Sequence, residues 1–177
     1  MGNNIKGYHI HNYEKCVCFM ESNELTVSKD KEYLGCGMYF WDNHSNAMFW
    51  LGERRQQEGN RHRRLCLITC NINIDYMLDL TDNEIVKGII EAWHEYVIRT
   101  GSVEKAPLGY ILDTLDTLCS VKPFSVRKGS LHYNGAQNPF ADIKWGAKGH
   151  YFTVYSRIIY AVKDSEVIRN KRMEEVS

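Results

Sequence analysis

The sequence predicts an α+β fold in which a mostly antiparallel sheet is flanked by helices. Two observations lead to this fold class. Strand-like segments stand at the beginning and the end of the chain, whereas segments with helical periodicity lie between them. The chain also lacks the regular strand–helix alternation and the GxGxxG or P-loop motifs that are typical of doubly wound parallel sheets. We therefore expect one domain that spans residues 1–177.

Composition narrows the class of protein. The chain has 177 residues, of which 44% are hydrophobic and 25% charged, as in a globular protein with one core. Its 22 basic and 22 acidic residues balance, so no net charge attracts nucleic acid or an anionic membrane. No apolar run approaches a membrane span, no signal peptide opens the sequence, and the six cysteines lack a familiar zinc spacing. These features predict a cytoplasmic protein with reduced, buried thiols and no metal.

The first predicted element is a strand over residues 5–10. Its alternation places Tyr8 and Ile10 on one face and His9 on the other. A helix is expected to follow as far as residue 20, and residues 25–28 form a short extended piece.

The segment around which the chain is organised is residues 31–51. Two glycines flank Cys36 and allow the backbone to bend there or to approach a ligand closely. On the strand that follows, Tyr39 and Trp41 face one way and Phe40 faces the other. Aromatic faces beside glycine backbone suit a flat ring. The alternative is that these aromatics belong only to the core.

A helix capped by Asp42 and Asn43 is expected next, because apolar side chains recur after them at helical spacing. Residues 52–64 are then polar and basic, which favours either a helix end with a solvated loop or a patch for a phosphate-bearing partner. The arginines of this segment are Arg54, Arg55, Arg61, Arg63 and Arg64.

A core strand followed by helices is predicted in the middle of the chain. Residues 65–74 alternate as the core strand, and residues 77–80 either extend the sheet or begin a turn. Thr81 and Glu84 have the spacing of a capping box for the first helix, and Gly101 fits just past its end.

The last third of the chain is predicted to be loop and strand. Pro107 opens the second helix, and residues 120–148 read as a long loop region of the kind that often covers a site. Residues 150–163 form two extended pieces that pivot about residues 156–157. Asp164 then caps a short tail whose end is expected to fray.

Three motifs together resemble the ADP-ribosyltransferase superfamily, in its poly(ADP-ribose) polymerase branch. They are a strand ending in Tyr8-His9, the run Gly35-Cys36-Gly37-Met38-Tyr39-Phe40-Trp41-Asp42, and Asn46-Ala47-Met48-Phe49. A closer form, which small bacterial and phage proteins share, has counterparts here in residues 32–41 and 156–163. The resemblance reaches both ends of the chain and implies a split antiparallel sheet with flanking helices.

The resemblance also implies that NAD is bound as a substrate. His9 matches the histidine that bonds the adenosine ribose, and Tyr39 matches the tyrosine that stacks on the nicotinamide. Ile159 takes the place of the catalytic glutamate or glutamine, so that the triad reads His, Tyr, Ile.

The resemblance aligns four further positions, and three of them, Ile10, Asn46 and Phe49, are implied to contact NAD. Ile10 replaces a glycine whose backbone bonds the nicotinamide amide, and His11 replaces a small hydroxyl residue. Asn46 falls near the polar residue that bonds the carboxamide, and Phe49 matches the second stacking aromatic after a gap of one residue.

The replacement at Ile159 leaves three functions open. A glutamate there stabilises the oxocarbenium-like state and aligns the ribose hydroxyls, which isoleucine cannot do. Mono-ADP-ribosylating members of the superfamily also carry isoleucine, which implies that an acidic acceptor supplies the carboxylate. The chain is then a mono-ADP-ribosyltransferase, such as a toxin or effector, whose acceptor is a protein, a nucleic acid or a small molecule. The alternatives are an NAD glycohydrolase and a non-catalytic module that binds a nucleotide or a partner protein.

Overall fold

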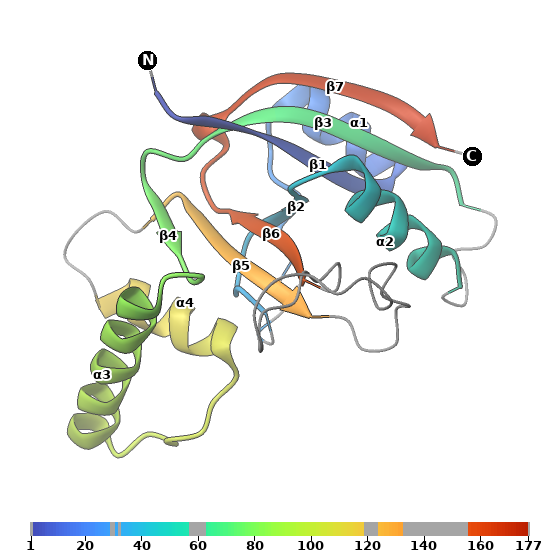
Figure 1. The fold of residues 1–177 in the computed structure, drawn as a ribbon. Coiled ribbons are helices and arrows are strands. Elements are labelled where there is room, and N and C mark those ends of the chain that lie inside the picture. The colour runs from blue at the N-terminus through green and yellow to red at the C-terminus, as the bar shows by residue number, and fades with distance from the viewer. Residues whose placement is uncertain are drawn as a thin grey trace, which may run out of the picture.

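The computed structural model describes residues 2–28, 31, 33–56, 63–118, 124–132 and 156–176. They form a mixed α/β fold with one seven-stranded sheet and four α-helices in the described part of the chain (Figure 1). The elements in chain order are β1 (Asn4–Asn12), α1 (Tyr13–Ser22), β2 (Met38–Trp41), α2 (His44–Gln56), β3 (Leu65–Asn73), β4 (Met77–Asp79), α3 (Asn83–Thr100), α4 (Leu108–Leu118), β5 (Val126–His132), β6 (Ser156–Val162), a 3₁₀ turn (Ser165–Val167) and β7 (Ile168–Val176).

The sheet has the order β4-β5-β6-β2-β1-β3-β7, and every pair except β4 with β5 is antiparallel. Its strands are joined unevenly. β1 pairs with β3 along its whole length, whereas β1 and β2 are matched at a single position, Tyr8 opposite Trp41. Beyond this single pair, the described residues of β1 and β2 are not matched within the sheet. The mostly antiparallel sheet with its helices is compatible with the predicted α+β class.

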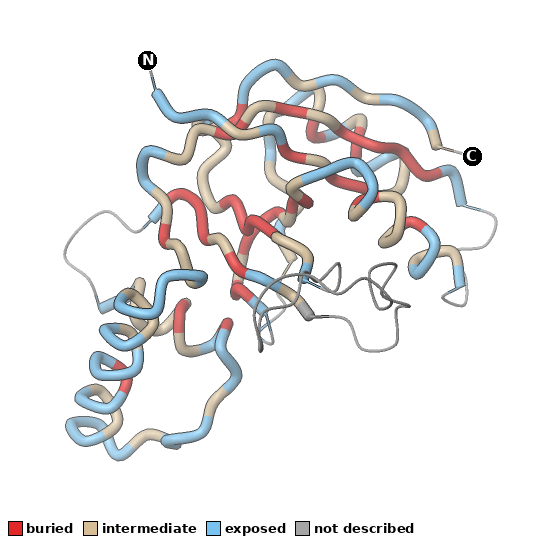
Figure 2. The backbone as a smooth tube through the Cα atoms, in the orientation of Figure 1, coloured by how far each residue is buried: buried red, intermediate tan, exposed pale blue. Residues whose placement is uncertain are grey.

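Side chains alternate between the two faces along each strand, and both faces carry a buried cluster. Phe40 of β2 packs on the face covered by Phe19 of α1, while Trp41 faces Leu51 of α2. Buried residues follow the central strands in Figure 2. The predicted alternation, with Tyr39 and Trp41 on one face of the strand and Phe40 on the other, is confirmed.

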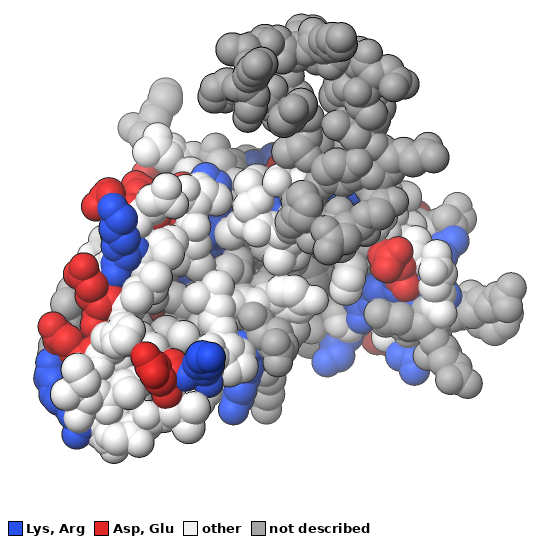
Figure 3. Space-filling view, turned by 60° about the horizontal axis from the view of Figure 1, so that its bottom comes forward, with Lys and Arg blue, Asp and Glu red and all other residues white. Residues whose placement is uncertain are grey.

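Helices α3 and α4 form a hairpin that lies beside the β4 and β5 end of the sheet (Figure 1). Trp93 of α3 meets Tyr110 of α4 edge to face, with ring centroids 6.1 Å apart. Acidic and basic side chains are interspersed on the surface seen in Figure 3. Within α3, Lys87 pairs with Glu84 at 2.6 Å. No described helix is long and apolar enough to cross a membrane.

Several local predictions need correction. Asp82, rather than Thr81, caps α3 and accepts the Glu84 N–H, because the Thr81 hydroxyl donates to Asp79 instead. The pivot predicted at residues 156–157 is wrong, since both lie inside β6 and pair with β5.

The predicted fraying of the chain end is also wrong, because residues 168–176 form an edge strand paired with β3. Residues 150–155 and most of the predicted loop 120–148 lie outside the described residues, although β5 occupies part of that loop.

Candidate functional site

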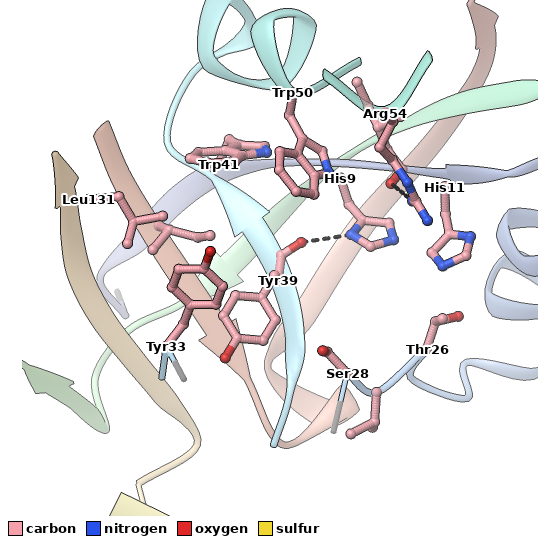
Figure 4. A pocket seen from close by; sticks show the side chains of 13 residues that line it. His9, His11, Thr26, Ser28, Tyr33, Tyr39, Trp41, Trp50, Arg54 and Leu131 are labelled. Carbon is pink, nitrogen blue, oxygen red and sulfur yellow. Dashed lines mark hydrogen bonds between the residues drawn. The ribbon is translucent and has the colours of Figure 1, made fainter. Parts of the chain in front are cut away.

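A cavity of about 280 Å³ lies where β1 and β2 separate (Figure 4). Strands β1, β2, β5 and β6, helix α2 and the segments before β2 all contribute to its wall. The described residues that line it are His9, Ile10, His11, Thr26, Val27, Ser28, Tyr33, Tyr39, Trp41, Trp50, Arg54, Leu131 and Ile159.

The structure brings together the three residues of the predicted triad. His9 lies on β1, Tyr39 on β2 and Ile159 on β6, and all three line this cavity. Strand pairing explains the convergence, since Trp41 of β2 is opposite Tyr8 on one side and Ile159 on the other. Ile10 lines the cavity as well.

Asn46 and Phe49 do not line the cavity. The Asn46 amide donates to Asp42, and its oxygen accepts a hydrogen bond from Arg157 at 2.8 Å. The Arg157 guanidinium also lies 3.8 Å above the Phe49 ring centroid. Trp50, the next residue on α2, lines the cavity instead of Phe49.

His9 is a neutral side chain of defined tautomer. It is 8% exposed, and its Nδ1 lies 2.6 Å from the backbone oxygen of Tyr39. Because a carbonyl oxygen can only accept, Nδ1 carries the proton and Nε2 is an acceptor. Burial lowers the pKa of His9 to about 4, so the ring stays neutral at pH 7. Nε2 is buried and has no hydrogen-bond partner among the described residues.

The ring of Tyr39 is held in place at both ends. Its backbone oxygen accepts from His9, its hydroxyl accepts the Leu34 N–H at 3.0 Å, and the same hydroxyl donates to the Gly35 oxygen at 2.7 Å. An aromatic ring fixed in this way loses little conformational freedom when a flat ligand stacks on it.

The loop that holds Tyr39 rests on a buried ionic cluster. Arg127 of β5 is fully buried and pairs with Asp113 at 2.7 Å and Asp116 at 2.6 Å, both on α4. Asp113 also accepts the Cys36 N–H, and these bonds keep the pKa of its carboxyl below the usual value despite burial. Gly35 has φ +78°, and a Cβ there would meet Arg127 at 2.5 Å, so this position requires glycine.

No acidic side chain is among the described residues that line the cavity. At the position that the resemblance aligns with a catalytic carboxylate, Ile159 presents only hydrocarbon and belongs to the same buried cluster as Trp41 and Leu34. Any carboxylate used in chemistry here must come from outside this described wall.

The described arginines of residues 52–64 have different surroundings. Arg54 enters the cavity and donates to the Ile10 oxygen, while Arg55 donates to the Val176 oxygen. Arg64 forms a two-bond ion pair with Glu175. Arg63 is exposed, and Arg61 lies outside the described residues.

The described cysteines are all free, but their surroundings differ. Cys16 and Cys70 are buried, and burial raises the pKa of each thiol to about 12, which leaves them unreactive. Cys66 is also buried, whereas Cys18 is exposed and Cys36 is half-buried, so the prediction of burial holds for only part of the set. Among the described residues, no group of three histidine, cysteine or acidic side chains is placed to hold a metal ion.

Sequence reasoning missed Trp50, Tyr33 and Arg54 as cavity residues. The sequence places Trp50 only within the helix predicted after Asn43, and Arg54 only within a basic segment. The direction of the Trp50 and Arg54 side chains depends on how α2 crosses β1, which helical spacing alone does not specify.

Comparison with protein-family models and with curated protein sequences gives no match for this chain.

Proposed function

We propose that the cavity binds NAD and that the protein is a mono-ADP-ribosyltransferase. The observation that carries the proposal is the convergence of His9, Tyr39 and Ile159 from three strands in the wall of one cavity. The ADP-ribosyltransferase resemblance requires this convergence, and side chains on separate faces of the domain would have removed it.

The cavity residues suit a dinucleotide of this kind. The orphaned Nε2 of His9 is an acceptor, which a ribose hydroxyl would satisfy. The fixed ring of Tyr39 offers a face for the nicotinamide, and Trp50 adds apolar surface to the same cavity. Stacking of this type contributes roughly 0.5–1.5 kcal/mol beyond the burial of area.

The chemistry would break the bond between nicotinamide and ribose and leave its electron pair on the nicotinamide. The positive charge that develops on the ribose needs an anion nearby, and the described wall offers none. An acceptor carboxylate would supply both the charge and the nucleophilic oxygen, and it would lose no proton on joining the ribose.

A non-catalytic nucleotide-binding module is the second candidate. It is favoured by the apolar Ile159 and by the Ile10 oxygen, which Arg54 occupies at 3.0 Å. In the family this backbone position binds the nicotinamide amide. Because Arg54 already bonds the Ile10 oxygen, the contact favours a module that binds a nucleotide without cleaving nicotinamide from it.

The test uses Ile159→Glu beside the natural protein. A carboxylate at this position should raise the release of nicotinamide from NAD in the absence of an acceptor, which reports hydrolysis. Because burial raises the pKa of such a glutamate, the assay is run at pH 8. Ile158→Glu is the matched control, since the neighbouring side chain packs on the opposite face of β6.

Label from adenine-labelled NAD should also appear on a macromolecular fraction of a cell lysate with the natural protein. Release of nicotinamide by the natural protein without any acceptor would instead identify a glycohydrolase. NAD binding without turnover in either protein would leave the binding module, and absence of NAD binding would overturn the proposal.

A further inference from the structure

Arg54 places an unbalanced positive charge in the cavity. Among the described residues that line the cavity, it alone is charged at neutral pH. Its side chain is half-buried, and no carboxylate in the described part of the chain pairs with it. Desolvation lowers the pKa of the Arg54 guanidinium, which records the cost of holding this charge away from water. An anion bound beside it would offset that cost.

The guanidinium is hydrogen-bonded to the backbone of β1. Nη1 donates to the Ile10 oxygen at 3.0 Å, and this is the one hydrogen bond that Arg54 makes within the described residues. Its remaining N–H donors are therefore available to a ligand. In Figure 4 the side chain extends from α2 toward His9 and His11.

His11 supplies a second donor beside Arg54. Its Nδ1 accepts the Asn12 N–H at 2.8 Å, so in the neutral ring the proton is on Nε2. Burial and the neighbouring His9 lower the pKa of His11 to about 3, which keeps it neutral. A neutral Nε2–H next to a guanidinium donates to an anion without adding charge.

His9 offers an acceptor where His11 offers a donor. Its ring stacks on His11 with centroids 5.8 Å apart, and its buried Nε2 is an acceptor without a partner. The two stacked histidines therefore present one donor and one acceptor. A ligand that matches them carries an anionic group beside a hydroxyl, which is the pattern of a phosphorylated ribose.

We propose that Arg54 and His11 form a phosphate subsite of this cavity, which selects nucleotides whose phosphate lies next to a ribose hydroxyl held by His9. The subsite rests on the proposed binding of NAD, because NAD carries a diphosphate between two riboses. It does not require that the bound nucleotide is turned over. It also assigns Arg54 to the inside of the cavity and not to a surface patch.

Calorimetric titration of ADP-ribose, adenosine and inorganic pyrophosphate into the natural protein and Arg54→Met tests the subsite. We expect the affinity for ADP-ribose to fall about tenfold or more in Arg54→Met, as for the loss of a charge-assisted contact, while adenosine binds equally to both. Arg55→Met is the matched control, because Arg55 is the next residue on α2 and bonds the Val176 oxygen instead. It should bind ADP-ribose as the natural protein does.

A second measurement needs no variant. In the natural protein, inorganic pyrophosphate should compete with ADP-ribose but not with adenosine, and the affinity for ADP-ribose should fall as salt increases. Equal ADP-ribose affinity in the natural protein and Arg54→Met would overturn the subsite, as would the absence of any ADP-ribose or pyrophosphate binding. Loss of ADP-ribose binding in Arg54→Met without NAD turnover in the natural protein would support the subsite and reject the transferase.

Discussion

The cavity region and the α3–α4 hairpin both contain many apolar residues, but they differ in how far these residues are buried. Strands β1, β2 and β6 bury side chains on both faces of the sheet. α3 packs against α4, and Trp93 is the one residue of α3 that is buried. Ile98, near the end of the same helix, is 79% exposed. Periodicity therefore specifies which side chains share a face, whereas the elements packed around that face decide whether it is buried.

Arg127→Ala should have the largest effect, because this residue joins the two regions. Its removal leaves the half-buried carboxylates of Asp113 and Asp116 without their shared cation, apart from Lys163. We expect a loss of about 3–5 kcal/mol in the free energy of unfolding. Urea denaturation followed by circular dichroism measures it, and a loss below about 1 kcal/mol would mean that the hairpin is not anchored by this cluster.

A pair of identical substitutions compares the two regions directly. Ile72→Ala in β3 removes a fully buried side chain and should cost about 2–5 kcal/mol, whereas Ile98→Ala in α3 should change stability by less than about 0.5 kcal/mol. Denaturant midpoints of both variants give the comparison. Similar losses at both positions would show that a partner or another segment covers α3 in solution.

His9 should make the cavity region sensitive to acid. Because its pKa is about 4 in the folded protein against an ordinary value of 6.5, the unfolded chain binds more protons between these values. Stability from this group is therefore complete above pH 6.5 and is lost as the pH falls toward 4, by about 3 kcal/mol in total. Melting curves of the natural protein and His9→Gln between pH 7 and pH 4 measure the difference. Parallel curves would contradict the burial of a neutral His9.

The sequence predicted the strands of the cavity better than it predicted the helices around them. Two-residue alternation with bulky side chains correctly assigned the faces of Tyr39 and Phe40, because the sheet is covered on both sides. That His9 and Ile159 would lie close together was predicted only by the family resemblance, because residues so far apart in the chain give no local signal.

The helical side of the site could not be predicted in the same way. Counting from a motif predicts Phe49, but Trp50 and Arg54 lie on the side of α2 that lines the cavity, and Phe49 packs against Arg157. At the chain end, charged residues suggested fraying, but they are the side chains of an edge strand, where charge discourages further pairing.

The central claim is that the cavity binds NAD through the face of Tyr39. Calorimetric titration of NAD into the natural protein, Tyr39→Phe and Tyr39→Ala tests it, since phenylalanine keeps the ring and loses only the hydroxyl contacts with the loop. We predict saturable binding to the natural protein, similar binding to Tyr39→Phe, and a loss of about 1 kcal/mol or more in Tyr39→Ala. Equal affinity for NAD in the natural protein and a folded Tyr39→Ala variant, or no binding to the natural protein, would contradict the claim.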